Sequence, residues 1–223
     1  GNNLINIFMG GAKLDDRTKL FFDNNGIKIC EGYGCSETSP IISINHQNYP
    51  RDIYSVGKIL DNVIVEIIEK EICVSGPNIM KGYWNDTQKN DEVFIHKKDE
   101  KFYKTGDSGY IQNGYLYYTG RINENYKMSN GKFVNISQLE SKLKEYINTN
   151  FIVYGENMDH NILIVEEPFN TNMLSKINDN IDNFMKIKKI ILIKSEEMKT
   201  FLTPKLSIKR KSLINYVKKE YLN

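Results

Sequence analysis

The sequence has no long hydrophobic run, few candidate metal ligands and little net charge. No stretch of about 18 apolar residues occurs, so no membrane-spanning helix is predicted. The three cysteines and three histidines are scattered, without the spacing of a zinc site. A formal net charge of +2 gives no electrostatic reason to expect a nucleic-acid partner. These absences exclude a membrane-spanning protein, a zinc-bound fold and a strongly basic nucleic-acid-binding protein.

The cysteines also indicate the compartment. Cys30 and Cys73 lie in apolar, strand-like contexts, so we expect buried free thiols in a reducing environment. No secretory signal peptide opens the chain, and the predicted localisation is cytoplasmic, with peripheral contact with a membrane left open. The chain starts at once on the apolar run Leu4–Met9, which is typical of a core strand without a lead-in. We therefore expect residue 1 to correspond to an internal position of a longer protein.

The first part of the sequence alternates strands, glycine turns and a helix. The run Leu4–Met9 predicts a strand that ends at Gly10–Ala12, and apolar residues within Leu14–Phe22 predict a short helix. A second strand at Ile27–Ile29 leads to another glycine-bearing turn at 31–40. Two such loops that follow two strands are expected at one edge of an open α/β sheet, where ligands collect.

Residues 54–119 are rich in β-type patterns. Turns are predicted at 69–70 and at the Asn-Gly pair 113–114, which is a hairpin signal. Asp107 lies in a tight turn between glycines, and a strand follows at 115–119. The next segment, 119–125, is polar, so we predict a domain boundary there.

The second half reads as a small α+β domain. Short strands are predicted at 151–154, 162–165 and 187–193, with helices between and after them. A capping box is predicted at 137–140, and Leu213 and Val217 mark the last helix. The predicted fold class is therefore α/β and α+β, with domains at 1–120 and 121–223.

The glycine-bearing turn 31–40 has the residue types of a nucleotide site. Its glycines allow backbone conformations and close approaches that side chains would block. Tyr33 offers a flat face for a base, Ser36 a hydroxyl for a phosphate oxygen, and Glu37 a hard oxygen for Mg²⁺. The same residues also suit an ordinary loop, so the flanking motifs decide between the two interpretations.

Five motifs in order resemble those of the adenylate-forming superfamily, and within it acyl-CoA and acyl-acyl-carrier-protein synthetases. They lie at 9–14 (Met-Gly-Gly-Ala-Lys-Leu), 32–37 (Gly-Tyr-Gly-Cys-Ser-Glu), 71–83 (Glu-Ile to Gly-Tyr), 103–107 (Tyr-Lys-Thr-Gly-Asp) and 120–140 (Gly-Arg, then Lys-Met-Ser-Asn-Gly-Lys, then Leu-Glu). Ser36 replaces the family's threonine but keeps the hydroxyl, and Lys70 replaces the first glycine of the third motif. The Ser-Asn-Gly-Lys sequence at 129–132 is most similar to that of the long-chain fatty-acyl members of the family.

This resemblance implies a fold and a reaction. Residues 1–120 would form the C-terminal part of a large AMP-binding domain, and 121–223 its small mobile domain. The implied reaction uses ATP and Mg²⁺ to convert a fatty acid to an acyl-adenylate, and then transfers the acyl group to CoA. The partners would be the fatty acid, the thiol of CoA or of a carrier protein, and the N-terminal part of the same chain.

The resemblance also implies roles for individual residues. Glu37 would hold Mg²⁺ and support catalysis, Ser36 would bind phosphate, and Asp107 with Arg121 would bind the ribose hydroxyls. The remaining nucleotide-binding and hinge positions carried over from the motifs are Gly10, Gly11, Ala12, Tyr33, Gly34, Lys127 and Gly131. Tyr33 would stack on adenine, and the loop at Gly131 would serve thioester formation.

Two departures from the family pattern leave three functions open. The family carries a phosphate loop and most of its fatty-acid tunnel upstream of the Gly-Gly-Ala loop, so this chain alone is not expected to be active. Near the end, Ser207 stands where the adenylation lysine belongs, although Lys205 and Lys209 would share its side of an extended segment. The alternatives are part of a fatty acid–CoA ligase, a ligase that serves a carrier protein, and a weakened nucleotide- or acyl-binding homologue.

Overall fold

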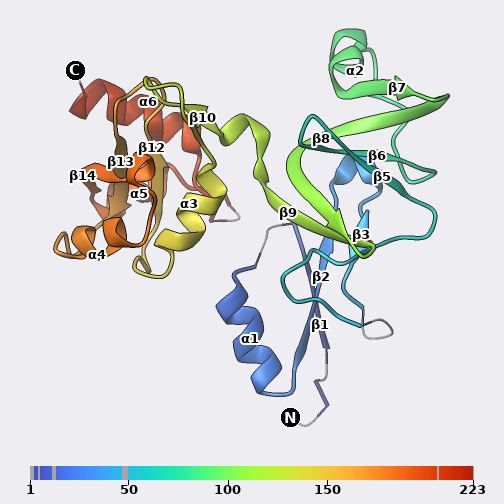
Figure 1. Ribbon diagram of the computed structural model, residues 1–223, viewed down its shortest axis with the longest axis horizontal. Helices are drawn as coiled ribbons and strands as arrows, with labels where there is room; N and C mark the ends of the chain where they lie inside the picture. Colours follow the sequence, from blue (N-terminus) through green and yellow to red (C-terminus); the bar gives the residue numbers. More distant parts are fainter. Residues whose placement is uncertain (1–2, 5, 12–13, 47–49, 205, 223) are drawn as a thin grey trace. The chain divides into compact units, whose positions relative to one another are not determined.

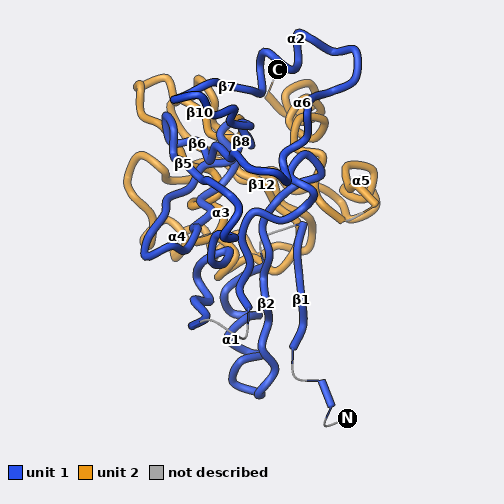
Figure 2. The backbone as a smooth tube through the Cα atoms, turned by 90° about the vertical axis from the view of Figure 1, so that its right-hand side faces the viewer, with its two compact units in different colours: residues 1–122 blue, residues 123–223 orange. Residues whose placement is uncertain are grey.

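The computed structural model describes residues 3–4, 6–11, 14–46, 50–204 and 206–222. It divides into two compact units, Gly1–Ile122 and Asn123–Asn223 (Figure 2). Both units contain helices and strands, which agrees with the predicted mixed α/β content. No helix among the described residues is long and apolar enough to cross a membrane.

Unit 1 is built on a sheet of nine strands within the described residues (Figure 1). The strand order is β1-β2-β3-β4-β9-β8-β6-β5, and β7 pairs with β8. The pair β1–β2 is parallel, and the other pairs are antiparallel. The bounds are β1 Asn6–Gly10, α1 Asp16–Asn24, β2 Lys28–Tyr33, η1 Ser36–Thr38, β3 Ser43–Ile44, β4 Lys58–Ile59, β5 Ile64–Ile68, β6 Glu71–Ser75, α2 Thr87–Val93, β7 Phe94–Lys97, β8 Glu100–Gln112, β9 Tyr115–Arg121 and η2 Ile122–Glu124.

The parallel strands β1 and β2 bring the two glycine loops to the same edge of the sheet, as predicted. Gly10 at the end of β1 lies opposite Gly32 near the end of β2. Between these strands, the Asp15 side chain caps α1 by accepting a 2.9 Å hydrogen bond from the Thr18 N–H. Strand β2 continues to Tyr33, so the tyrosine leaves a strand and its position is set by the sheet.

Both predicted hairpin turns are present. Glu69 and Lys70 have φ of 50° and 71°, and Asn113 and Gly114 have φ of 52° and 78°, the left-handed values that tight two-residue hairpins require. The second turn joins β8 to β9, in which Asp107 lies opposite Arg121. Strand β9 extends to Arg121, two residues beyond the predicted end at 119, because its pairing with β8 continues to that residue.

Unit 2 packs helices on both faces of a three-stranded sheet, in the order β12-β13-β14. One face packs on α3 and α4 and the other on α5 and α6, because successive residues of the fully buried β13 point to opposite sides. The strand predictions match closely. The bounds are β10 Tyr126–Lys127, β11 Phe133–Val134, α3 Ile136–Leu143, β12 Phe151–Tyr154, β13 Asn161–Glu166, α4 Met173–Asp179, η3 Asn183–Met185, β14 Ile187–Ile193, α5 Ser195–Thr200 and α6 Arg210–Tyr221.

The predicted capping box at 137–140 is wrong. Helix α3 begins at Ile136, and the side chain of Asn135 is its cap, accepting a 3.0 Å hydrogen bond from the Gln138 N–H. The Glu140 carboxylate instead accepts from the Val153 N–H at 2.7 Å and pairs with Arg210. Glu140 therefore forms a long-range ion pair and does not cap the start of the helix, contrary to the prediction from the local sequence.

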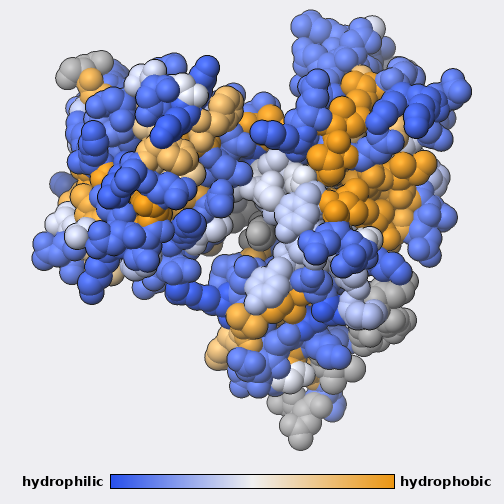
Figure 3. Space-filling view, in the orientation of Figure 1, coloured by the Kyte–Doolittle hydropathy of each residue, from blue (hydrophilic) through white to orange (hydrophobic). Residues whose placement is uncertain are grey.

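Unit 1 covers its apolar residues less completely than unit 2. Its core cluster contains Ile42, Val56, Val63, Ile72, Val74 and Leu116. Figure 3 shows apolar side chains gathered at its surface, over the region of β5, β6 and β8. Ile64 and Ile67 of β5 are both exposed. The core cluster of unit 1 thus lies among β6, β9 and the segments that precede β3, β4 and β5.

Candidate functional site

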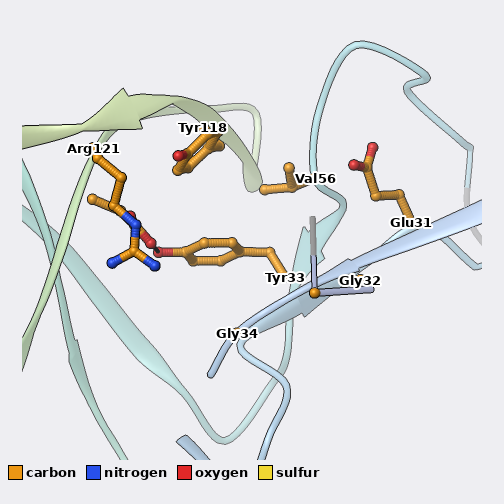
Figure 4. A pocket seen from close by; sticks show the side chains of 9 residues that line it. Glu31, Gly32, Tyr33, Gly34, Val56, Tyr118 and Arg121 are labelled. Carbon is orange, nitrogen blue, oxygen red and sulfur yellow. Dashed lines mark hydrogen bonds and ion pairs between the residues drawn. The ribbon is translucent and has the colours of Figure 1, made fainter. Parts of the chain in front are cut away.

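A pocket lies at the carboxyl ends of β1 and β2 in unit 1 (Figure 4). It has a volume of about 100 Å³ and is open to solvent, so it is smaller than the roughly 300 to 1,000 Å³ of typical ligand pockets. Its lining combines glycine backbone, aromatic rings and charged groups from five segments. The lining residues are Gly11, Glu31, Gly32, Tyr33, Gly34, Val56, Asp107, Tyr118 and Arg121.

Tyr33, Asp107 and Arg121 form a connected polar group in this pocket. The Tyr33 hydroxyl donates a 2.7 Å hydrogen bond to Asp107 Oδ2, and Arg121 Nε lies 3.0 Å from Asp107 Oδ1. The β8–β9 register places Asp107 and Arg121 directly opposite each other, which explains their ion pair. Figure 4 shows the guanidinium beside the tyrosine hydroxyl. The buried carboxylate is thus fixed from two sides.

The environment of Tyr33 keeps its hydroxyl protonated. Burial raises the pKa of Tyr33, and the negative charge of Asp107 and the hydrogen bond to it raise this pKa further. The group therefore acts as a hydrogen-bond donor at neutral pH. Since its oxygen is held by Asp107, the ring has a defined orientation and presents a fixed flat surface.

The turn after Tyr33 requires glycine at position 34. A Cβ atom there would lie 1.9 Å from the Pro40 carbonyl oxygen, so no side chain fits. The turn is closed by the Thr38 hydroxyl, which accepts a 3.0 Å hydrogen bond from the Cys35 N–H. Ser36 is exposed on the same turn. The backbone is therefore compact at the turn that the sequence predicts as part of a nucleotide site.

Glu37 is a half-buried carboxylate held by a neighbouring tyrosine hydroxyl. Its Oε1 accepts a 2.8 Å hydrogen bond from the Tyr83 hydroxyl, and this bond lowers the pKa of Glu37, as does the charge of Arg121. Within the part of the chain that the structure describes, no three His, Cys, Asp or Glu residues gather as a metal site. One ionised carboxylate fits Mg²⁺ that is bound mainly by phosphate oxygens.

The other predicted residues lie in several places. Gly10 ends β1 and Gly11 lines the pocket, while Ala12 lies outside the described residues. In unit 2, the exposed Lys127 belongs to β10, and Gly131 occupies a turn with φ of 81°.

The segment around Ser207 is extended on one side only. The Leu206 N–H donates to the Thr203 carbonyl at 2.9 Å, and Leu206 has φ of 61°, so a turn precedes Ser207. Residues 207–209 pair with 201–203 through the antiparallel bridge between Leu202 and Ile208. Ser207 and Lys209 are exposed, and Lys209 Nζ lies 3.4 Å from the Thr200 carbonyl oxygen. Lys205 lies outside the described residues.

Sequence reasoning did not single out Glu31, Val56 and Tyr118 as lining residues. Tyr118 shares a strand face with Leu116 and Gly120 by the two-residue period of β9, but this period does not indicate which face lines a pocket. Glu31 is buried, and its Oε2 lies 2.5 Å from Nζ of the buried Lys19. A lysine in an amphipathic helix is usually exposed, so no local signal predicts that ion pair.

Comparison with protein sequences identifies relatives of the chain. The family model described as "AMP-binding enzyme" matches residues 2–84. The long-chain-fatty-acid–CoA ligase FadD15 of Mycobacterium tuberculosis is 34% identical over 148 residues, which cover 66% of this chain and 24% of that protein. The D-alanine–D-alanyl carrier protein ligase of Listeria monocytogenes is 34% identical over 93 residues, or 42% of this chain and 18% of that protein.

Comparison with solved structures shows the same fold in larger proteins. The anthranilate CoA ligase AuaEII in complex with anthranoyl-AMP has a TM-score of 0.76 at 17% identity, over 96% of this chain and 45% of that one. The O-succinylbenzoate coenzyme A synthetase of Bacillus subtilis, in complex with ATP and magnesium ion, has a TM-score of 0.74 at 21% identity, over 93% and 46%. The chain thus spans less than half of each structure.

Proposed function

Because the chain belongs to the adenylate-forming, AMP-binding superfamily, we propose that it is part of an ATP-dependent ligase that activates a fatty acid. In this proposal the ligase forms an acyl-adenylate and then a thioester with CoA. The mycobacterial relative, named as a long-chain fatty acid ligase, supports this substrate class. The chain spans 24% of that relative, so the activity is proposed for the longer protein to which these residues would belong.

The observation that carries the proposal is the Tyr33–Asp107–Arg121 group beside glycine backbone. An ionised carboxylate can accept about four hydrogen bonds, and Asp107 uses one for Tyr33 and one for Arg121. A buried carboxylate held in this way can accept ribose hydroxyls, in the manner of acidic residues in dinucleotide sites. The oriented Tyr33 ring offers a stacking face for the adenine.

The chemistry requires that negative charge at the α-phosphate be offset while the nucleoside is held in place. Asp107 and Tyr33 hold the ribose and the base, and Arg121 supplies a fixed positive charge beside them. The compact turn at Gly34 and the Ser36 hydroxyl bind phosphate oxygens. Mg²⁺, when bound with ATP, neutralises phosphate charge, and Glu37 supplies a protein oxygen for it.

A ligase that serves a carrier protein is the second candidate. The Listeria relative, named for a carrier protein acceptor, favours it. Both candidates predict the same nucleotide pocket and differ in the thiol that accepts the acyl group. Incubation of the ligase with ATP, palmitate and either CoA or a phosphopantetheinylated carrier protein distinguishes them by which thioester forms.

Equilibrium binding of AMP tests the nucleotide site. The protein should bind AMP, and Asp107→Ala should weaken binding by about 1 to 3 kcal/mol, the value of a buried polar contact to a charged group. Asp61→Ala is the matched control, since Asp61 is an exposed aspartate in a loop of the same unit. Equal AMP affinity in both variants and the wild type would contradict the site.

A further inference from the structure

Tyr83 lies shortly before helix α2 in the chain, and its side chain contacts Glu37 in a distant turn. We propose that Tyr83 is a positioning residue, which fixes the Glu37 carboxylate for a phosphate-bound divalent cation, and that Asn90 of α2 in turn fixes Tyr83. This inference rests on the proposed function. Tyr83 touches neither the nucleotide nor the cation in this account and acts through Glu37.

The contact between Tyr83 and Glu37 joins two distant parts of the sequence. The Tyr83 hydroxyl donates a 2.8 Å hydrogen bond to Glu37 Oε1 from 46 positions away, and both side chains are half-buried. A carboxylate has two oxygens with about four acceptor sites, so one bond leaves capacity for a cation. A glutamate side chain with three rotatable bonds would otherwise sample many positions.

The backbone holds the same two segments together. The Met80 N–H donates to the Glu37 carbonyl at 2.8 Å, and the Asn78 amide donates to the carbonyls of Thr38 and Ile41 at 3.0 Å each. The 78–83 segment is therefore bound to the 37–41 turn at Glu37 and at two residues after it. Its alignment with the Glu37 turn is defined before any ligand binds.

Asn90 fixes Tyr83 at its own backbone. Its Oδ1 accepts a 2.7 Å hydrogen bond from the Tyr83 N–H, and its Nδ2 donates to the Tyr83 carbonyl at 3.0 Å. The fit is close, because a Cβ on Gly82 would lie 2.9 Å from Asn90 Oδ1. Helix α2 is capped by Asp86, which accepts from the Lys89 N–H at 2.9 Å. The helix thus presents one amide that holds both backbone groups of Tyr83.

Tyr83→Phe tests this arrangement, because it removes one hydroxyl and keeps the ring. The control is Tyr110→Phe, which removes a hydroxyl from an exposed tyrosine of β8 in the same unit. Mn²⁺ serves as the divalent probe, with binding followed by electron paramagnetic resonance in the presence of a non-hydrolysable ATP analogue. The affinity for the analogue without metal is measured separately, and thermal melting checks the fold of each variant.

Tyr83→Phe should weaken Mn²⁺ binding roughly tenfold, as loss of a supporting hydrogen bond to a metal ligand typically does, with metal-free analogue affinity unchanged. Asn90→Ala should weaken Mn²⁺ binding in the same direction, and Tyr110→Phe should not. A purely structural role would lower both affinities together. Wild-type Mn²⁺ affinity in a folded Tyr83→Phe variant overturns the positioning role alone. A wild type that binds no analogue overturns the proposed function and this role with it.

Discussion

The Tyr33 hydroxyl donates a 2.7 Å hydrogen bond to Asp107 Oδ2, although 74 positions separate the two residues. In the sheet order, β3, β4 and β9 stand between the strands that carry them, so no backbone pairing brings the two together. The hydrogen bond between the two side chains joins β2 to β8 at the pocket. The geometry of the proposed nucleoside site thus depends on one buried hydrogen bond across unit 1.

Tyr33→Phe should destabilise unit 1 while it preserves the aromatic face. The substitution leaves the buried Asp107 with one partner fewer, and an unsatisfied buried polar group costs about 1 to 3 kcal/mol. Amide hydrogen exchange in the paired strands β8 and β9 reports on the stability of this unit. Unchanged protection factors would show that the hydrogen bond contributes nothing to its stability.

The Tyr33 hydroxyl should stay protonated far above neutral pH. Its pKa is raised in the folded protein, so its contribution to stability is complete below the ordinary value of about 10 and is lost as the pH rises through the folded pKa. The ¹³Cζ signal of Tyr33 should therefore remain unshifted up to pH 10.5. In Asp107→Asn the pKa should fall, because a neighbouring negative charge is removed. A wild-type signal that titrates near pH 10 would contradict the burial described.

Removal of Arg210 should make the stability of unit 2 depend on pH, because the buried Glu140 then loses its ion pair with Arg210. Burial raises the pKa of Glu140 to about 7, and the Arg210 guanidinium acts in the opposite direction. A raised pKa means that stability is complete below the ordinary value of about 4.5 and is lost as the pH rises through the folded pKa. Arg210→Met should therefore cost about 3 to 5 kcal/mol at pH 8 and less at pH 5.

Amide hydrogen exchange at Val153, whose N–H donates to Glu140, measures this loss within unit 2. The double variant Glu140→Gln with Arg210→Met should recover most of the stability, because no buried charge remains. A single Arg210→Met variant as stable at pH 8 as at pH 5 would show that Glu140 is not held in a low-dielectric site.

Much of unit 2 could be predicted from sequence because its signals are local. The strands β12 and β14 have the predicted bounds, since continuous apolar runs between polar turns define them. The start of α3 could not be predicted in the same way. Glu140 has the spacing of a capping residue but is used by Arg210, 70 positions away. A local pattern carries no information about such a distant partner.

The candidate pocket shows the same limit. Its glycines, Tyr33 and Asp107 stand out in sequence because turns and motifs mark them. Glu31 and Tyr118 do not, since both belong to strands in which a polar or aromatic side chain is ordinary. They line the pocket because of where β2 and β9 lie in the sheet. Sequence periodicity does not predict the order of strands in a sheet.

Ser207→Lys should accelerate the first half-reaction of the longer ligase and leave the second unchanged. A missing ion contact to the developing charge at phosphorus would cost on the order of 3 kcal/mol, or roughly a hundredfold in rate. Fatty-acid-dependent ATP–pyrophosphate exchange measures adenylation, and thioester formation from supplied acyl-adenylate measures the second step. Fast wild-type exchange that Ser207→Lys leaves unchanged, but that Lys205→Ala or Lys209→Ala abolishes, would assign the role to a neighbouring lysine.

Recognition of the ribose hydroxyls of an adenine nucleotide by Asp107 can be measured in a binding cycle with two nucleotides. Affinities for AMP and for 2′,3′-dideoxy-AMP are measured by calorimetry in the wild type and in Asp107→Ala. The wild type should prefer AMP by about 1 to 3 kcal/mol, and the preference should disappear in Asp107→Ala. An equal preference for AMP in both proteins would contradict this role of Asp107, because the hydroxyls would then be recognised elsewhere.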